Sequence, residues 1–269
     1  MASEIDKLKS TNRMLIVALI IGSFFLGSLT NRVATLEKNG PSDSANVQGA
    51  TIFPTDSQQQ PTQPSITIDK IKALFNDKNL VLGDKNSKNL LVEIADPSCP
   101  YCQAVAGMNP ELNKQIGSQF TLQSDGGDYI APVPEMKKLV DQGKAAFVYI
   151  YAVGHGAGEM GTKALYCANE QGKFWQVHDL LMSNAGYNLM NNDVKNDKTK
   201  SQQLVDFLSS AADNNQLKQC IDSGKYDKKL SEDTATASSL GFRGTPDFYI
   251  NTTNFPGAQN WKNMQSAVK

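Results

Sequence analysis

The sequence has little net charge and few of the residue types that build metal centres. Lys and Arg number 26 against 27 Asp and Glu, so the formal net charge is −1. No basic stripe is present, which argues against a nucleic-acid-binding protein. The chain has two histidines and four cysteines. The four that lie outside the one Cys-x-x-Cys pair, Cys167, Cys220, His155 and His178, stand far apart in the sequence. A structural zinc site needs four ligands. We therefore predict no metal site and no cofactor, and both histidines stay unassigned.

Long apolar runs are also scarce, and the one exception stands near the N-terminus. Residues 14–29 include no charged side chain, and the run is slightly shorter than the roughly 17–25 residues of a membrane-spanning helix. Thr30 and the snorkelling of Arg13 and Arg32 make up the difference. A cleaved signal peptide is the alternative, but no clean small-x-small cleavage pair follows the run. We therefore expect an uncleaved transmembrane anchor at 14–30, with residues 1–13 in the cytoplasm.

The next segment, residues 31–65, is rich in Ser, Thr, Gln and Pro. Such a composition buries too little apolar surface to offset the entropy lost on ordering the chain. We expect a disordered low-complexity linker that holds a folded domain, residues 66–269, away from the membrane.

Two cysteines follow an apolar run at the start of that domain. Asn89–Ala95 is rich in Leu, Val and Ile, which is typical of a buried strand. Asp96-Pro97-Ser98 closes the strand, Cys99 and Cys102 come next, and Gln103–Met108 has helix-forming composition. The order is strand, short turn, Cys-x-x-Cys, helix.

This order places Cys99 at a helix N-terminus, where free N–H groups and the helix dipole favour a thiolate. Pro100 suits the first helical turn because it has no N–H to leave unpaired. Cys102, one turn further on, would be shielded and would attack a mixed disulfide formed at Cys99. Half of a zinc site and an inert structural disulfide are the alternatives, and we favour the redox pair.

The remaining elements are predicted from apolar periodicity and from Gly and Pro. We expect an α/β domain that begins with a short helix over 68–75 and an edge strand at 80–83. After the cysteine motif come helices at 111–116 and 136–142 around an irregular loop at 119–134, and then a core strand at 145–153. Helices follow from 156 to 240 with a polar interruption at 184–200, and the chain ends with a strand at 248–250, a turn over 251–257, and a helix at 259–268 that carries Trp261 and Met264 on one face.

Cys167 and Cys220 each lie in a helical segment. Four cysteines suit an exported protein, and with only these two beyond the motif we favour a structural disulfide between them. Two small buried apolar residues are the other interpretation.

Together these motifs resemble the DsbA family of thiol-disulfide oxidoreductases. The resemblance covers roughly residues 66–269. It depends on Glu93 six residues before the first cysteine, Cys99-Pro100-Tyr101-Cys102, the run Ala168–Trp175, and Gly244-Thr245-Pro246 before the last strands. It implies a thioredoxin-like fold with an inserted α-helical domain at about 156–240.

The resemblance also implies roles for particular residues. Pro246 would be cis and lie beside the active-site disulfide, and Thr245 would offer its backbone to an extended substrate chain. Pro100 and Tyr101, between the cysteines, would contact the substrate as well. Glu93 would lie buried beneath the cysteines and relay a proton to Cys102. An edge-strand carboxylate that faces water is the alternative for Glu93.

Two departures from the family leave the redox direction open. Oxidases of the family often carry His between the cysteines, where this chain has Tyr101, and Cys-Pro-Tyr-Cys is also similar to glutaredoxins and to a periplasmic isomerase-like relative. The insertion at 119–134 is unusual as well.

The favoured hypothesis is a single-pass protein of the cell membrane whose C-terminal domain lies outside the cytoplasm. It would form or exchange disulfides in exported cysteine-containing proteins, with Cys99, Cys102 and Glu93 as catalytic residues. The resemblance implies a quinone-linked membrane protein that reoxidises the pair. The alternatives are a tethered scaffold with structural cysteines and a disulfide reductase or isomerase.

Overall fold

The computed structural model describes residues 66–269. The cytoplasmic segment, anchor and linker predicted at 1–13, 14–30 and 31–65 lie outside the described residues. Between residues 66 and 269, no helix is long and apolar enough to cross a bilayer.

A five-stranded mixed sheet forms the centre of the domain, with strand order β1-β3-β2-β4-β5. Its strands are β1 (Leu80–Gly83), β2 (Asn89–Ala95), β3 (Ala145–Tyr151), β4 (Asp247–Ile250) and β5 (Thr253–Pro256). The inner strand β2 pairs in parallel with β3 and antiparallel with β4. Every residue of β2 and β3 is buried, which agrees with the continuous apolar runs that predicted core strands there.

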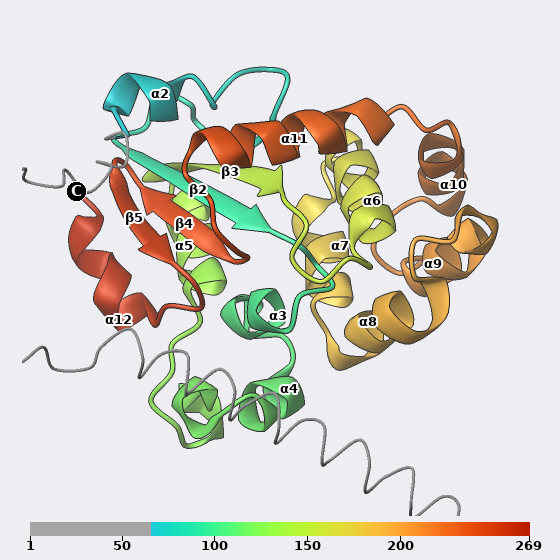
Figure 1. The fold of residues 1–269 in the computed structure, drawn as a ribbon, viewed down its shortest axis with the longest axis horizontal. Coiled ribbons are helices and arrows are strands. Elements are labelled where there is room, and N and C mark those ends of the chain that lie inside the picture. The colour runs from blue at the N-terminus through green and yellow to red at the C-terminus, as the bar shows by residue number, and fades with distance from the viewer. Residues whose placement is uncertain (1–65) are drawn as a thin grey trace, which may run out of the picture. The chain divides into compact units, whose positions relative to one another are not determined.

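Helices cover both faces of the sheet (Figure 1). On one face, α2 (Ile68–Lys72) and α11 (Asp227–Ser239) pack against Val92, Val148 and Ile150. On the other face lie α3 (Pro100–Ala106), α5 (Pro132–Asp141) and α12 (Trp261–Met264). Trp261 and Met264 are both buried there, as their shared helical face predicted.

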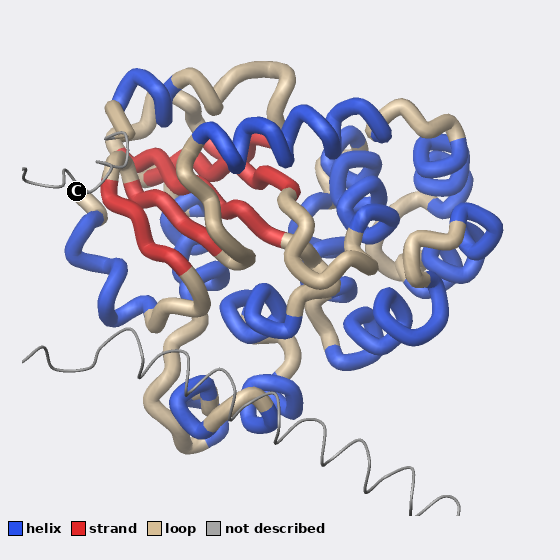
Figure 2. The backbone as a smooth tube through the Cα atoms, in the orientation of Figure 1, coloured by secondary structure: helices blue, strands red, loops and turns tan. Residues whose placement is uncertain are grey.

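A block of helices follows β3 and stands beside the sheet (Figure 2). It comprises α6 (Glu159–Glu170), α7 (Phe174–Leu181), α8 (Asn184–Asn188), α9 (Ser201–Phe207) and α10 (Asn214–Asp222), and it leads into α11. The polar interruption predicted at 184–200 is wrong, because α8 runs into a π-helical segment, η3 (Leu189–Val194), and a 3-10 turn, η4 (Lys198–Lys200). Two apolar side chains, Met190 and Val194, anchor this segment in the core.

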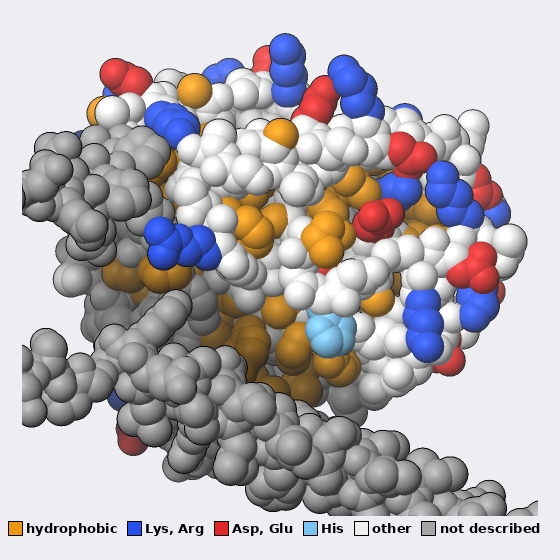
Figure 3. Space-filling view, in the orientation of Figure 1, with side chains coloured by type: hydrophobic (Ala, Val, Ile, Leu, Met, Phe, Trp, Pro, Cys, Tyr) orange, Lys and Arg blue, Asp and Glu red, His pale blue; other side chains and the backbone are white. Residues whose placement is uncertain are grey.

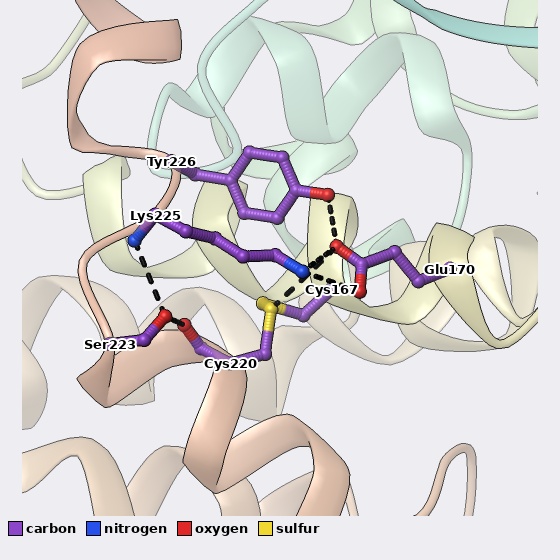
Figure 4. The surroundings of a disulfide bond; sticks show 6 residues. All are labelled: Cys167, Glu170, Cys220, Ser223, Lys225 and Tyr226. Carbon is purple, nitrogen blue, oxygen red and sulfur yellow. Dashed lines mark hydrogen bonds and ion pairs between the residues drawn. A yellow bond between two sulfur atoms is a disulfide. The ribbon is translucent and has the colours of Figure 1, made fainter.

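The disulfide between Cys167 and Cys220 joins α6 to α10, with a Cα–Cα distance of 5.9 Å (Figure 4). Beside it, the Glu170 carboxylate accepts hydrogen bonds from the Tyr226 hydroxyl and the Lys225 ammonium. The pairing favoured from the sequence is therefore confirmed, and it joins two helices through cysteines that are 53 residues apart in the chain.

The prediction of an irregular loop at 119–134 is wrong in part. The chain leaves α3 at Gly107, whose φ of 69° is left-handed, and returns at α5, which begins at Pro132 rather than Met136. Prolines fit there because the N–H groups of a first helical turn have no partner within the helix. The segment between, residues 108–131, contains α4 (Pro110–Gln115) and two 3-10 turns, η1 (Ser118–Phe120) and η2 (Gln123–Asp125).

The prediction of a turn over residues 251–257 is wrong in part. Thr253–Pro256 is the edge strand β5, which pairs antiparallel with β4. The reversal is confined to the two residues before it, and Asn251 adopts a left-handed φ of 56°. Asn is among the few side chains that tolerate this conformation.

Candidate active site

The two cysteines of the Cys-x-x-Cys pair lie at the N-terminus of α3, directly after the inner strand β2. Cys99 is the N-cap residue and Pro100 is the first helical residue. Cys99 is 5% exposed and Cys102 is fully buried, and the two sulfurs are not bonded to each other. The sequence-predicted order of strand, turn, cysteines and helix is confirmed.

The pKa values of the two thiols are shifted in opposite directions. A hydrogen bond from Cys102 lowers the pKa of Cys99 from 9.0 to about 6, against the opposing effect of burial, and hydrogen bonds from Thr245 and from the backbone N–H groups of Cys102 and Tyr101 add to the shift. Burial raises the pKa of Cys102 well above its usual value, and the thiolate of Cys99 raises it further. Cys99 is therefore the more readily ionised thiol of the pair, and the thiolate is the form of cysteine that attacks disulfides and leaves from them.

The loop before β4 lies against Cys99. The Thr245–Pro246 peptide bond is cis, and the Cys99 thiol donates a hydrogen bond of 3.6 Å to the carbonyl oxygen of Thr245. The pairing of β4 with β2 brings these residues together, because Asp247 lies opposite Ile94. Pro246 is buried and Thr245 is partly exposed.

Glu93 is fully buried in the inner strand β2, where it lies opposite Tyr149 and Phe248. Within residues 66–269, neither of its carboxylate oxygens has a hydrogen-bond partner. Burial raises the pKa of Glu93 to about 8, and its charge contributes to the raised pKa of Cys102. The water-facing alternative is therefore wrong. Glu93 is a protonated acid at neutral pH, close enough to Cys102 to influence its ionisation.

Tyr101 is the exposed residue of the motif, with 45% of its surface accessible. Its ring packs edge-on against Phe120 of the 108–131 segment, with ring centroids 5.8 Å apart. Phe120 in turn packs edge-on against the buried Tyr129, whose hydroxyl bonds to the Gln259 carbonyl at 3.0 Å. The 108–131 segment, which contains most of the predicted insertion, thus supports the Tyr101 ring between the two cysteines. Figure 3 shows that hydrophobic side chains are exposed near the middle of this view, while charged side chains gather toward its upper and right-hand edges.

Sequence reasoning missed Asp96. This buried residue follows β2 directly, and its carboxylate accepts hydrogen bonds from five donors in the Ser98 turn and the loop after β3. An acidic residue next to Pro97-Ser98 at the end of an apolar run was the available signal. Its long-range partners could not be read from the sequence, because Gly154 is 58 residues away.

The two histidines do not join the cysteines in a metal site. His155 is exposed in the loop after β3, while His178 is buried against the rings of Phe174 and Trp175. Among residues 66–269, no group of three or more His, Cys, Asp and Glu side chains has an arrangement suited to a metal ion.

Comparisons with known proteins agree with this architecture. A profile of the thioredoxin family matches residues 134–269, a segment that includes the cis proline and begins after the cysteines. The chain is 24% identical over 208 residues to a Rickettsia prowazekii protein that is by name a candidate protein-disulfide oxidoreductase. The match covers 77% of this chain and 66% of the relative, so the chain spans slightly less than two thirds of that protein.

Two solved structures have the same fold. Wolbachia pipientis α-DsbA1, in a double cysteine-to-alanine form, superimposes with a TM-score of 0.55 at 19% identity, over 76% of this chain and 94% of the other. The catalytic domain of Proteus mirabilis ScsC gives a TM-score of 0.51 at 18% identity, over 76% and 97%. The chain thus belongs to the thioredoxin family. Its helical block between β3 and β4 makes its architecture DsbA-like.

Proposed function

We propose that this chain is a thiol-disulfide oxidoreductase that forms or exchanges disulfides in exported cysteine-containing proteins. One observation carries the proposal: two unbonded sulfurs with opposite pKa shifts lie at the head of α3 beside a cis-proline loop. A scaffold has no need for a stabilised thiolate next to a shielded thiol. Names of relatives that contain "protein-disulfide oxidoreductase" support the same class.

The oxidative reaction starts from a Cys99–Cys102 disulfide. A substrate thiolate attacks the Cys99 sulfur, a substrate–Cys99 disulfide forms, and Cys102 leaves as a thiolate. A second substrate thiolate then attacks the substrate sulfur of the mixed disulfide, and Cys99 leaves. The substrate gains one disulfide and loses two electrons, which reduce the cysteine pair to its dithiol form. The lowered pKa of Cys99 makes it the favoured leaving group.

Glu93 supplies the proton that the buried Cys102 needs. A thiolate at Cys102 is destabilised by burial, so its departure is easier if an acid protonates it. Glu93, with a pKa of about 8, holds that proton at neutral pH. In the reverse direction, the carboxylate takes the proton back as Cys102 attacks the mixed disulfide.

Thr245 and Pro246 would hold the substrate. The Thr245 carbonyl next to the Cys99 sulfur is a backbone acceptor for an extended chain, in the manner of β-strand addition. Pro100 and the exposed ring of Tyr101 offer apolar contact on the other side of the sulfur.

The proposed location rests on the sequence, and the proposed redox partner rests on the resemblance to the DsbA family. The apolar run at 14–29 and the polar linker after it favour a membrane-anchored protein with its catalytic domain outside the cytoplasm, where disulfides persist. A quinone-linked membrane protein would reoxidise the cysteine pair.

The reduction potential of the Cys99–Cys102 pair, together with turnover on a reduced, unfolded model protein, tests the proposal. A value near −120 mV with disulfide formation indicates an oxidase, and a value near −270 mV indicates a reductase. An intermediate value with reshuffling of wrong disulfides indicates an isomerase. An ordinary Cys99 titration near pH ~8.5 without dithiol turnover would show that the chain is a scaffold instead.

A further inference from the structure

Asp96 connects two segments that are distant in sequence. One carboxylate oxygen, Oδ1, accepts hydrogen bonds from the Ser98 N–H at 2.8 Å and the Ser98 hydroxyl at 2.6 Å. The other oxygen, Oδ2, accepts from the N–H groups of Gly154 and His155 at 2.9 Å each and of Gly156 at 3.3 Å. The side chain is fully buried. It therefore joins the cysteine turn to the loop after β3, which we call the 153–157 loop.

A second hydrogen bond strengthens this junction. The Ser98 hydroxyl, which donates to Asp96, accepts from the Ala157 N–H at 3.2 Å. At Gly158, directly after this loop, an added Cβ would collide with the Asp96 carboxylate. The close approach of the two segments therefore depends on a small residue as well as on the charge.

The 153–157 loop in turn lies against Thr245. An added Cβ on Gly154 would collide with the Thr245 hydroxyl oxygen. Apart from its interaction with Cys99, that buried hydroxyl has no hydrogen-bond partner within residues 66–269. It lies close enough to Cys99 to favour the thiolate. A shift of the loop would therefore change the space that holds the Thr245 side chain against the reactive sulfur.

The backbone of Asp96 also contacts both cysteines. Its carbonyl accepts from the Cys99 N–H at 2.9 Å, and its N–H donates to the Cys102 sulfur at 3.5 Å. The residue is thus in contact with each part of the site: the cysteine turn, the shielded sulfur, and the loop that packs on Thr245.

We propose that Asp96 is a positioning residue for Cys99, whose carboxylate holds the 153–157 loop in place so that Thr245 stays against the reactive sulfur. A carboxylate suits this role because its two oxygens accept up to four or so hydrogen bonds and offer no donor. Such bonds are also about twice as strong as those between neutral groups. An amide would turn an NH₂ group toward N–H donors on one of the two sides.

Several other titratable groups lie on the elements around the cysteine pair, and their effects on Cys99 must be separated from that of Asp96. They are Cys102 on α3, Glu93 on β2, Tyr187 on α8, whose pKa is raised by burial and further by the Cys99 thiolate, and His155 in the loop itself. Loss of the Asp96 charge and loss of its positioning role would change the pKa of Cys99 in opposite directions. A negative neighbour disfavours a thiolate, so removing the charge alone would lower the pKa of Cys99. Loss of positioning would raise it, because the hydrogen bond from Thr245 would weaken.

The experiment is a titration of the reduced full chain by the ultraviolet absorbance of the thiolate. We expect Asp96→Asn to raise the Cys99 midpoint by about one pH unit, a tenfold loss of thiolate at lower pH. Thr245→Val should produce a similar rise. The double variant should show no further rise, because both changes remove the same interaction. A fall or no change in Asp96→Asn, or additive effects in the double variant, would overturn the proposal.

Controls separate positioning from general loss of structure. Asp233 is another fully buried carboxylate, which accepts from the Tyr151 N–H at 3.3 Å, so Asp233→Asn should lower stability and leave the Cys99 midpoint unchanged. His155→Gln removes the one titratable side chain of the 153–157 loop and should also leave it unchanged. A shift in either control that matched Asp96→Asn would contradict the proposal.

Gly154→Ala tests the same link from the other side and serves if Asp96→Asn does not fold. It keeps the carboxylate but pushes on the Thr245 hydroxyl, so the Cys99 midpoint should again rise. An unchanged midpoint would count against the proposal. The inference rests on the proposed function, because positioning of Cys99 matters only if Cys99 reacts. The titration, however, measures the ionisation of Cys99 and does not depend on disulfide exchange. A wild-type protein that showed the shifts without disulfide exchange would disprove the function and leave the positioning role intact.

Discussion

The sulfur of Cys99 lies 3.6 Å from the carbonyl oxygen of Thr245, although 146 residues separate them in the chain. Cys99 is only 5% exposed, and the Thr245 backbone is one of the groups that lie against its sulfur. A substrate chain paired with that backbone would bring its own cysteine to the sulfur. In the proposed reaction, the contact would therefore link binding of an extended polypeptide to reaction at Cys99.

The lowered pKa of Cys99 predicts how stability changes with pH in the reduced protein. Between about pH 6 and pH 9, the unfolded chain binds the proton that folded Cys99 has lost. Its contribution to stability is complete above the ordinary pKa and is lost as pH falls through about 6. The difference in unfolding free energy between the reduced wild type and Cys99→Ser should therefore grow with pH across this window. Denaturant titrations at several pH values measure it, and a flat difference would contradict the shift.

Glu93→Gln should stabilise the protein at neutral pH and slow its chemistry. Folded Glu93 keeps its proton up to about pH 8, whereas an ordinary Glu loses it near 4.5. The raised pKa means that its stabilising contribution is complete below 4.5 and is lost as pH rises toward 8. We expect a gain of about 2–3 kcal/mol at pH ~7 and little gain at pH ~4.

The matched control for Glu93 is Glu135→Gln on α5, a surface residue paired with Lys138. It should change stability little at either pH. Stopped-flow measurement of the step in which Cys102 attacks or leaves should show a slower rate in Glu93→Gln alone. An equal gain in stability at both pH values would show that burial is not the cause.

Cys102→Ser should trap a mixed disulfide between a substrate protein and Cys99. The remaining thiol keeps a nucleophilic position at the head of α3, but the resolving sulfur is absent. The hydrogen bond from Cys102 is the largest cause of the lowered Cys99 pKa, so serine at this position should keep the shift better than alanine. Mass spectrometry of the complex with an unfolded cysteine-containing protein identifies the bond. Attachment at a cysteine other than Cys99 would contradict the assigned roles.

Removal of the Cys167–Cys220 disulfide should affect stability without abolishing exchange. The bond closes a loop of 53 residues between α6 and α10, for which chain entropy gives about 4 kcal/mol as an upper value. We expect the Cys167→Ala, Cys220→Ala variant to lose about 2–4 kcal/mol of unfolding free energy. Its Cys99 titration should be unchanged, since the bond joins α6 to α10 and Cys99 lies at the start of α3. Complete loss of dithiol turnover in a folded variant would point to a second redox role.

Phe120→Ala tests what the 108–131 segment contributes. The substitution removes the ring between Tyr101 and Tyr129, and edge-to-face aromatic pairs are each worth about 0.5–1.5 kcal/mol. With Tyr101 less supported, KM for an unfolded protein substrate should rise by a few-fold, while exchange with a small dithiol should stay the same. A comparable change with both substrates would indicate a general defect. Phe255→Ala, a partly buried ring on the edge strand β5, is a suitable control.

Particular residues show where sequence reasoning succeeded. The strand at Asn89–Ala95 and the start of α3 at Pro100 were predictable because a continuous apolar run, a proline and a capping position are local signals. The 184–200 segment was misjudged for the opposite reason. Two buried side chains, Met190 and Val194, hold a mostly polar stretch in place, and polar composition alone does not distinguish a loop from an exposed helix. At Pro132, two prolines suggested a loop but instead occupy a helical first turn.

The sequence by itself determined where the Cys-x-x-Cys pair lies, at the start of a helix, because helix capping, spacing and the order of neighbouring elements act over a few residues. It also determined the central strands, whose apolar runs require burial on both faces. Only the tertiary structure decided what surrounds the sulfurs: the Thr245 carbonyl against Cys99, the unpartnered carboxyl of Glu93, and the hydrogen bonds of Asp96 to the 153–157 loop. These contacts join segments that sheet pairing brings together across the chain. Their energies depend on burial and distance, which no local pattern of residues specifies.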